Sequence, residues 1–254
     1  MSADSTLVAG QAQVEVQGQV QVDSAASPVA DVEDLFSLGR SADAARDAAL
    51  GRRGTFTRAR RLLPTGSWRG PRDATVSYVE AADLAALGGW AAARDAGAAV
   101  LVGADLATAQ EAAAAGARVV ARLPFRSGEA EADRHGRLRA LAGAALPVWG
   151  VIPTPDREPY GLDTLRFTAL CRLELPGVAH VVADVEALGP RLAQMCLGFG
   201  ADELLAQVMS ERALRLGDNA NTTVLTRKEV VTLIRGAGLV PAERLAGDVL
   251  EDVT

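Results

Sequence analysis

A few carboxylates have the residue type and the position that general acid–base chemistry requires. Asp184 and Glu186 come directly after an apolar run, and Asp202 and Glu203 follow a glycine-rich turn, with Glu211 further along the chain. Side chains at the ends of buried strands are well placed to exchange protons with a substrate. We therefore take Asp202, Glu211 and Asp184 as candidate catalytic residues. The alternatives are structural, because Asp184 and Glu186 can cap a helix and Glu211 can belong to the solvated surface.

The chain contains two histidines and two cysteines. His180 lies on a predicted strand and is a candidate ligand-binding residue, with a half-buried structural role as the alternative. His135 lies among charged residues of a predicted helix, which indicates surface. Cys171 and Cys196 follow apolar positions, and we expect both to be packing thiols. This set is too small for a four-thiolate zinc site, and we predict no metal site.

Seven arginines and no acidic residue lie between residues 52 and 72. Guanidinium groups hold phosphates and carboxylates through paired hydrogen bonds. Arg58, Arg60 and Arg61 are therefore candidate ligand-binding residues. A solvated loop without a ligand is the alternative.

Composition and missing motifs exclude several classes of function. The net charge is −6, which argues against binding to nucleic acid or to anionic membranes. No P-loop, G-x-G-x-x-G, H-E-x-x-H or G-x-S-x-G pattern occurs. No apolar run reaches the ~18 residues that span a bilayer, and residues 1–30 do not resemble a signal peptide. We expect a cytoplasmic protein.

The order of predicted elements indicates an α/β fold. Residues 1–30 form a low-complexity stretch that we expect to be a disordered extension. Short β-branched runs alternate with alanine-rich helical patterns, and several of these patterns end in glycine. The predicted strands cover residues 74–79, 98–102, 117–123, 147–152 and 178–183. Parallel β-α units follow, in an open doubly wound sheet or a barrel. Residues 204–216 and 226–236 are predicted helices, and residues 241–254 an irregular tail.

The last third of the chain carries a set of short motifs. They are LDTLR at 162–166, CRL at 171–173, LGFGADE at 197–203, MSE at 209–211, TRKE at 226–229 and GLVPAER at 238–244. Together they resemble the C-terminal half of the radical S-adenosylmethionine (SAM) enzymes of the futalosine menaquinone pathway and of deazaflavin synthesis. Gly128-Glu129 resembles that family's glycine–glutamate turn, which makes Glu129 a candidate ligand-binding residue. The family's Gly-Ala-Asp turn lies at the pocket, which makes Asp202 the first choice among the carboxylates.

The resemblance implies a fold and also reveals a departure. It implies a partial or shortened (β/α) TIM-type barrel of the radical SAM kind over residues 31–198, followed by a helical C-terminal segment over 199–254. In the family, three cysteines spaced C-x-x-x-C-x-x-C hold a four-iron cluster that binds SAM. The corresponding loop here, residues 59–72, contains no cysteine. We therefore expect no cofactor, neither an iron–sulfur cluster nor bound SAM.

These observations lead to two functional hypotheses. The first is a cluster-free relative of the menaquinone enzymes, a pseudoenzyme that acts as a partner or binds a nucleoside metabolite. The second is an enzyme, transferase- or lyase-like, that applies acid–base chemistry to a futalosine-like nucleoside in a retained barrel pocket. A shortened barrel would expose strand edges, so we expect a homodimer or a complex with an intact family enzyme.

Overall fold

The computed structural model describes residues 28–63, 65–69, 76–103, 105–144, 147–156, 161–209, 224–245 and 249–253. The extension predicted over residues 1–30 lies outside this range except for its last three residues, which begin helix α1 (Pro28–Leu50). Glu211 also lies outside it.

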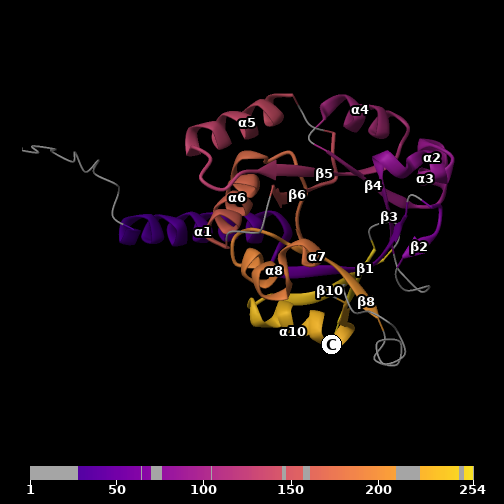
Figure 1. Ribbon diagram of the computed structural model, residues 1–254. Coiled ribbons are helices and arrows are strands. Elements are labelled where there is room, and N and C mark those ends of the chain that lie inside the picture. Colours follow the sequence, from indigo (N-terminus) through magenta and orange to yellow (C-terminus); the bar gives the residue numbers. More distant parts are fainter. Residues whose placement is uncertain are drawn as a thin grey trace, which may run out of the picture.

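A ring of parallel strands forms the centre of the molecule (Figure 1). In the described part of the chain the ring has the order β1-β3-β4-β5-β6-β7-β8, and β8 pairs back onto β1 in parallel. The expectation of a TIM-type barrel is confirmed, and the barrel closes with seven strands. They are β1 (Arg53–Leu62), β3 (Val76–Glu80), β4 (Ala98–Val102), β5 (Arg118–Phe125), β6 (Gly150–Pro155), β7 (His180–Asp184) and β8 (Glu203–Met209).

Helices cover the outside of the ring (Figure 1). They connect successive parallel strands, as right-handed β-α units require. They are η1 (Ala81–Asp83), α2 (Leu84–Leu87), α3 (Trp90–Asp95), α4 (Leu106–Ala114), α5 (Glu131–Gly143), α6 (Gly161–Glu174), α7 (Val185–Leu188) and α8 (Pro190–Leu197). The long helix α1 packs mainly against α6. No helix among the described residues is long and apolar enough to cross a membrane.

The C-terminal part of the chain completes the sheet. β10 (Val240–Arg244) runs parallel to the first half of β1, whose second half pairs with β3. The short strands β2 (Trp68–Arg69), β9 (Val224–Thr226) and β11 (Leu250–Asp252) add antiparallel or edge pairings. Helix α10 (Arg227–Gly236) begins at Thr226 with a capping box, as predicted.

Two predictions made from the sequence were wrong. Residues 203–209 form strand β8 rather than the start of a helix, and part of the expected irregular tail is strand β10. Residues 53–62 of the arginine segment form strand β1, so the alternative of a solvated loop does not hold there. Closure through β1 and β8 also removes the exposed barrel edge on which the expectation of a dimer was based.

Candidate functional site

The inside of the barrel is apolar in its middle and charged at both ends. Its middle layer is a separate buried cluster of small and apolar side chains, with Tyr78 among them. Side chains along a strand alternate between its two faces, so the residue two positions further on points the same way. Arg61, Glu80, Arg122 and Asp184 therefore face inward at the carboxyl ends of β1, β3, β5 and β7. These ends form the barrel mouth, where barrel enzymes carry their active sites.

The charged side chains at the mouth pair with one another. Arg61 contacts Asp184 with 2.9 Å between Nη2 and Oδ2. Arg122 lies 3.4 Å from the same oxygen and 3.1 Å from an oxygen of Glu80. The Asp184 carboxylate is buried and also caps α7 by accepting the Glu186 amide. The expectation that Asp184 caps a helix is thus confirmed, and the same carboxylate is the centre of the mouth.

The turn that joins β1 to β2 adds a second layer to this network. β2 pairs antiparallel with the end of β1 and brings Arg69 to within 2.6 Å of Glu186. Arg61 also contacts Glu186, at 3.4 Å. Burial alone would lower the pKa of Arg61, but Asp184 and Glu186 raise it above its usual value. The network leaves only about 10 Å³ of space between Arg61, Asp184 and Glu186.

Asp202 and His180 lie at the opposite, amino-terminal end of the barrel. Both precede or begin strands, β8 and β7 respectively. The expectation that Asp202 and Glu203 lie near the mouth is therefore wrong. Asp202 accepts from the Val181 amide at 2.8 Å and forms a buried ion pair with Arg172. Its second oxygen lies 2.6 Å from Nδ1 of His180.

Glu203 joins this end of the barrel to the C-terminal strand. Its carboxylate accepts from the hydroxyls of Thr55, at 3.1 Å, and Thr57, at 2.7 Å. Nε of Arg244 lies 2.6 Å from it. His180, Asp202 and Glu203 together offer ligand atoms within 4.8 Å of one another. Arg172 pairs with Asp202 and Arg244 with Glu203, so these carboxylates belong to a buried ion-pair network.

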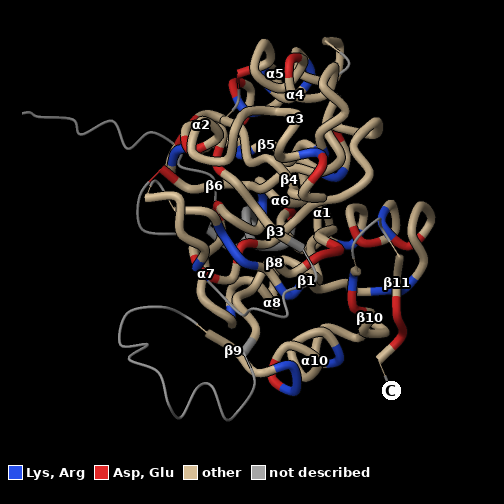
Figure 2. The backbone as a smooth tube through the Cα atoms, turned by 90° about the vertical axis from the view of Figure 1, so that its right-hand side faces the viewer, with Lys and Arg blue, Asp and Glu red and all other residues tan. Residues whose placement is uncertain are grey.

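The remaining candidate arginines are engaged on other faces of β1. Arg58 pairs with the buried carboxylate of Glu243. Arg60 donates to the Ser77 hydroxyl at 3.0 Å and stacks 4.4 Å from the centre of the Trp68 ring. Figure 2 shows basic and acidic segments interleaved around the barrel rather than one basic patch. Of the three candidates, Arg61 alone reaches the mouth network in the described structure.

Glu129 belongs to a pocket beside the mouth. The turn after β5 hydrogen-bonds to the start of α6, because Asp163 accepts from the Ser127 hydroxyl at 2.7 Å and from the Gly128 amide at 3.3 Å. Glu129 accepts from the Arg126 amide at 3.2 Å and pairs with Arg137 at 3.1 Å. The pocket has a volume of about 620 Å³. It is lined by Pro124, Phe125, Arg126, Ser127, Gly128, Glu129, Ala130, Asp133, Arg137 and Asp156.

The sequence analysis missed the residues that form ion pairs with these candidates. Arg122, Glu80, Arg172 and Arg244 were not among the candidates. Arg122 pairs with Asp184 and with Glu80, Arg172 pairs with Asp202, and Arg244 pairs with Glu203. A signal was present for two of them. Glu80 and Arg122 each stand two residues after an inward-facing residue of an apolar strand, which predicts a place inside the barrel end.

Part of the chain is similar in sequence to a group of known enzymes. A stretch of 84 residues is 33% identical to aminodeoxyfutalosine synthase of Thermus thermophilus, covering 33% of this chain and 23% of that enzyme. A stretch of 82 residues is 34% identical to cyclic dehypoxanthine futalosine synthase of Streptomyces coelicolor, covering 32% of this chain and 20% of that enzyme. The chain resembles the radical SAM enzymes of the futalosine pathway.

Two solved structures have a similar fold. Methylornithine synthase (PylB) matches with a TM-score of 0.58 and 14% identity, over 83% of this chain and 90% of that one. The hydrogenase maturase HydG matches with a TM-score of 0.57 and 9% identity, over 83% of this chain and 69% of that one. At such identities the likeness concerns the fold alone. No family model matches this radical SAM-like chain, and its matches span about a quarter of the curated relatives' length.

The comparisons contradict one expectation. We expected no cofactor, whereas the relatives are radical SAM enzymes that need an iron–sulfur cluster and SAM. Thiolates hold such a cluster, and the chain's own cysteines do not fit that role. Cys171 on α6 and Cys196 on α8 are buried in the apolar shell outside the barrel. Burial raises the pKa of both thiols, to about 12 for Cys196.

Proposed function

We propose that the chain is a non-catalytic, ligand-binding protein of the futalosine pathway that holds a nucleoside metabolite beside the barrel mouth. The observation behind this proposal is a difference in cavity volume between two places in the structure. The ion pairs of Arg61, Asp184 and Glu186 leave about 10 Å³ between them, whereas the pocket at the Gly128–Glu129 turn measures about 620 Å³. That volume lies within the ~300–1,000 Å³ of small-molecule sites.

The lining of this pocket suits a nucleoside. Glu129, Asp133 and Asp156 offer carboxylate oxygens that accept hydrogen bonds from ribose hydroxyls, and Phe125 and Pro124 offer apolar surface for a base. The relatives named for futalosine compounds support this class of ligand. Phe125 is held by a ring contact to Phe167, with 4.7 Å between centroids, so this wall of the pocket is preformed.

The pairing of the candidate carboxylates supports a non-catalytic role. A general base must give and take a proton, but the described candidates Asp184 and Asp202 each sit between guanidinium groups or beside a histidine. These ion pairs and hydrogen bonds hold both carboxylates in structural contacts within the protein rather than presenting them to a substrate. The alternative, acid–base catalysis on a futalosine-like nucleoside, is favoured by the position of Asp184 at the carboxyl end of β7, where barrel enzymes carry catalytic groups.

Titration calorimetry with futalosine-type nucleosides tests the proposal. We expect saturable binding that Glu129→Gln weakens about tenfold, since a hydrogen bond to a charged group is worth ~1.5–3 kcal/mol. Glu131→Gln is the matched control, because Glu131 is exposed and does not line the pocket. Absence of binding contradicts the proposal.

Product analysis by mass spectrometry separates the two candidate functions. We expect the nucleoside to be recovered unchanged. Turnover that disappears in Asp184→Asn supports the enzyme instead. Sedimentation of the protein, alone and with an intact family enzyme, tests the proposed homodimer or complex.

A further inference from the structure

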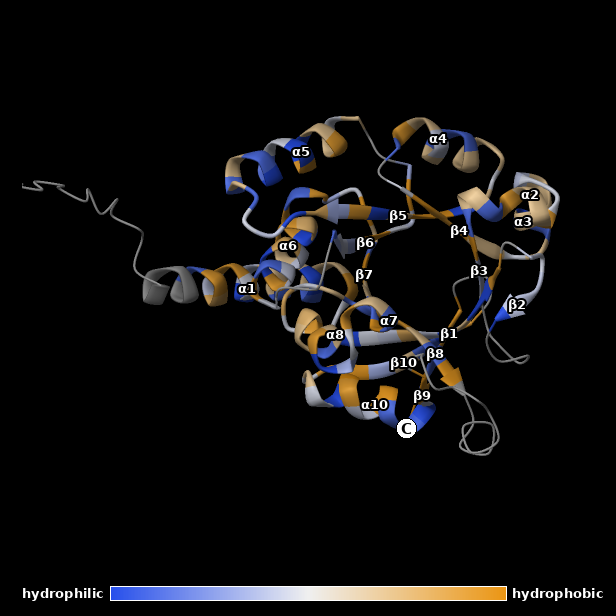
Figure 3. Ribbon diagram, in the orientation of Figure 1, coloured by the Kyte–Doolittle hydropathy of each residue, from blue (hydrophilic) through white to orange (hydrophobic). Residues whose placement is uncertain are grey.

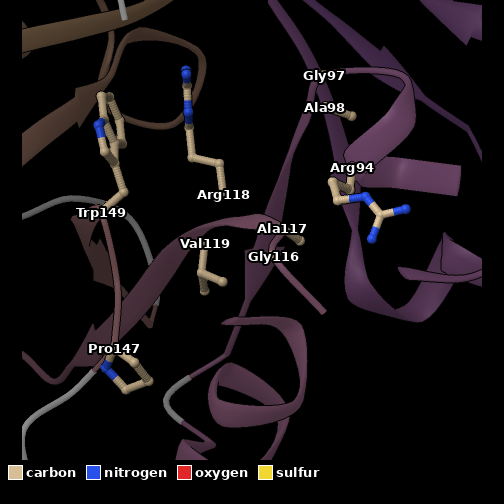
Figure 4. Close-up of a pocket in the computed structure, with 9 residues that line it drawn as sticks. All are labelled: Arg94, Gly97, Ala98, Gly116, Ala117, Arg118, Val119, Pro147 and Trp149. Atoms are coloured by element: carbon tan, nitrogen blue, oxygen red, sulfur yellow. The ribbon is translucent and has the colours of Figure 1, made fainter. Parts of the chain in front are cut away.

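A second pocket lies at the other end of the barrel, at the amino-terminal ends of β4, β5 and β6. Its volume is about 440 Å³. Its lining residues are Arg94, Gly97, Ala98, Gly116, Ala117, Arg118, Val119, Pro147 and Trp149 (Figure 4). This pocket shares no lining residue with the one that contains Glu129.

The chemistry of the lining is that of an anion site with an apolar floor. The described lining residues include two arginines and no acidic residue. Ala98, Ala117 and Val119 are buried and supply apolar surface to the lining. Arg94 comes from α3, and Arg118 and Val119 begin β5. A ligand that fills this space must therefore combine an anionic group with a flat or apolar part.

Trp149 gives the pocket a flat, fixed wall. The Arg118 guanidinium lies 5.2 Å from its ring centre, and Figure 4 shows the Arg118 side chain running alongside the tryptophan ring. Outside the pocket, the His180 ring lies 4.4 Å from Trp149 and the Arg244 guanidinium 4.8 Å. Asp202 holds His180 in turn, so this network at the barrel end positions the tryptophan.

Arg94 can pair with a bound anion because the ion pair that it would give up contributes little free energy. Within the described part of the chain it pairs with the carboxylate of its neighbour Asp95, at 2.8 Å, and the two side chains are 51% and 67% exposed. An ion pair so exposed contributes ~0–1 kcal/mol. A phosphate or carboxylate bound in the pocket offers Arg94 a better-shielded partner.

We propose that this pocket binds a planar anion, meaning an aromatic ring or nucleobase that carries a phosphate or a carboxylate. The ring packs against Trp149 and the apolar lining, and the anionic group pairs with Arg94. The proposal does not depend on the function proposed above, because it concerns a different pocket at the opposite end of the barrel.

Fluorescence and calorimetric titrations with three probes test this site. AMP supplies a ring with a phosphate, 4-hydroxybenzoate a ring with a carboxylate, and adenosine a ring with no anion. We expect AMP or 4-hydroxybenzoate to bind at least tenfold more tightly than adenosine, and the tighter of the two identifies the anion. Equal binding of adenosine, or no saturable binding of either anion, overturns the proposal.

Variants locate the binding. Arg94→Gln should weaken binding of the anionic probe about tenfold, and Trp149→Phe should remove most of the fluorescence change. Arg139→Gln is the matched control, since Arg139 is an exposed arginine of α5 paired with Glu174 at 3.2 Å. Unchanged affinity in Arg94→Gln overturns the proposal. Glu129→Gln, at the other pocket, should leave the affinity for the anionic probe unchanged. A loss of affinity in Glu129→Gln equal to that in Arg94→Gln also overturns the proposal.

Discussion

Glu203 and Arg244 form a buried ion pair although their strands do not border one another along the sheet order. Oε2 of Glu203 lies 2.6 Å from Nε of Arg244, and both side chains are less than 5% exposed. β8 and β10 both pair with β1, on the same stretch that carries Thr55. The ion pair therefore connects two strands through the one that they share.

Removal of one partner of this pair should be strongly destabilising. Arg244→Met retains apolar bulk but leaves the Glu203 charge buried, and we expect a loss of about 3–5 kcal/mol in the free energy of unfolding. Urea denaturation followed by circular dichroism measures it. Asp252→Asn is the control, because its pair with Arg53 is exposed and should contribute at most ~1 kcal/mol. Similar losses in the two variants would contradict the buried pair.

Gly200, in the glycine-rich turn before Asp202, cannot be replaced without strain. Its φ is +89°, and a Cβ there would lie 2.9 Å from both Ala42 and Arg172. We expect Gly200→Ala to lower the free energy of unfolding by about 3 kcal/mol, from strain and overpacking together. Gly136→Ala in helix α5 meets nothing within 4 Å and should stabilise the protein by ~0.5–1 kcal/mol. Thermal unfolding of both variants provides the comparison.

Asp163 should make stability depend on pH in the acid range. Burial alone would raise its pKa, but hydrogen bonds from Ser127 and Arg134 hold the pKa below its ordinary value. A folded-state pKa below the unfolded one gives stability that is present above pH ~4 and lost as pH falls through the folded pKa. Asp163→Asn should be less stable at pH 7 and show a shallower loss between pH 5 and 2. If the free energy of unfolding fell equally with pH in Asp163→Asn and in the unchanged protein, this prediction would be wrong.

The two thiols should be unreactive in the folded protein. Burial raises the pKa of Cys171 and of Cys196 far above neutrality, so the nucleophilic thiolate is scarce and inaccessible. We expect a thiol-specific chromogenic reagent to label neither cysteine in buffer and both in denaturant. Rapid labelling of either cysteine in the native state is the contrary result.

Apolar strands were predictable from the sequence, and charged strands were not. β4 and β7 are buried through most of their length and coloured as hydrophobic in Figure 3, and their positions were predicted within a few residues. β1 was missed because its arginines interrupt the apolar pattern, and their counter-charges come from distant elements such as Glu243 and Asp184. The apolar run in β8 carries no periodicity that separates a buried strand from a helix.

The residue types of the candidate site could be predicted from the sequence, but their positions in the barrel could not. Asp184 was taken as following a strand, and it is the last residue of β7, because the apolar run before it is clear in the sequence. Asp202 was assigned to the wrong end of the barrel, because the strand that follows it was taken for a helix. Its partners Arg172 and His180 are brought to it by the closure of the sheet, which no local pattern encodes.

The position of β1 has a consequence for the order in which the molecule assembles. β1 needs β8 on one side and β10 on the other, from nearly 150 and nearly 190 residues further along the chain. Contacts so distant in sequence form late and slow the folding of a domain. On the ribosome, β3 to β7 and the second half of β1 can pair as they emerge, while the first half of β1 waits with unpaired backbone until the final strands appear. A nascent chain stalled before residue 203 is then an open sheet with two free edges, the state in which this protein is most prone to aggregate.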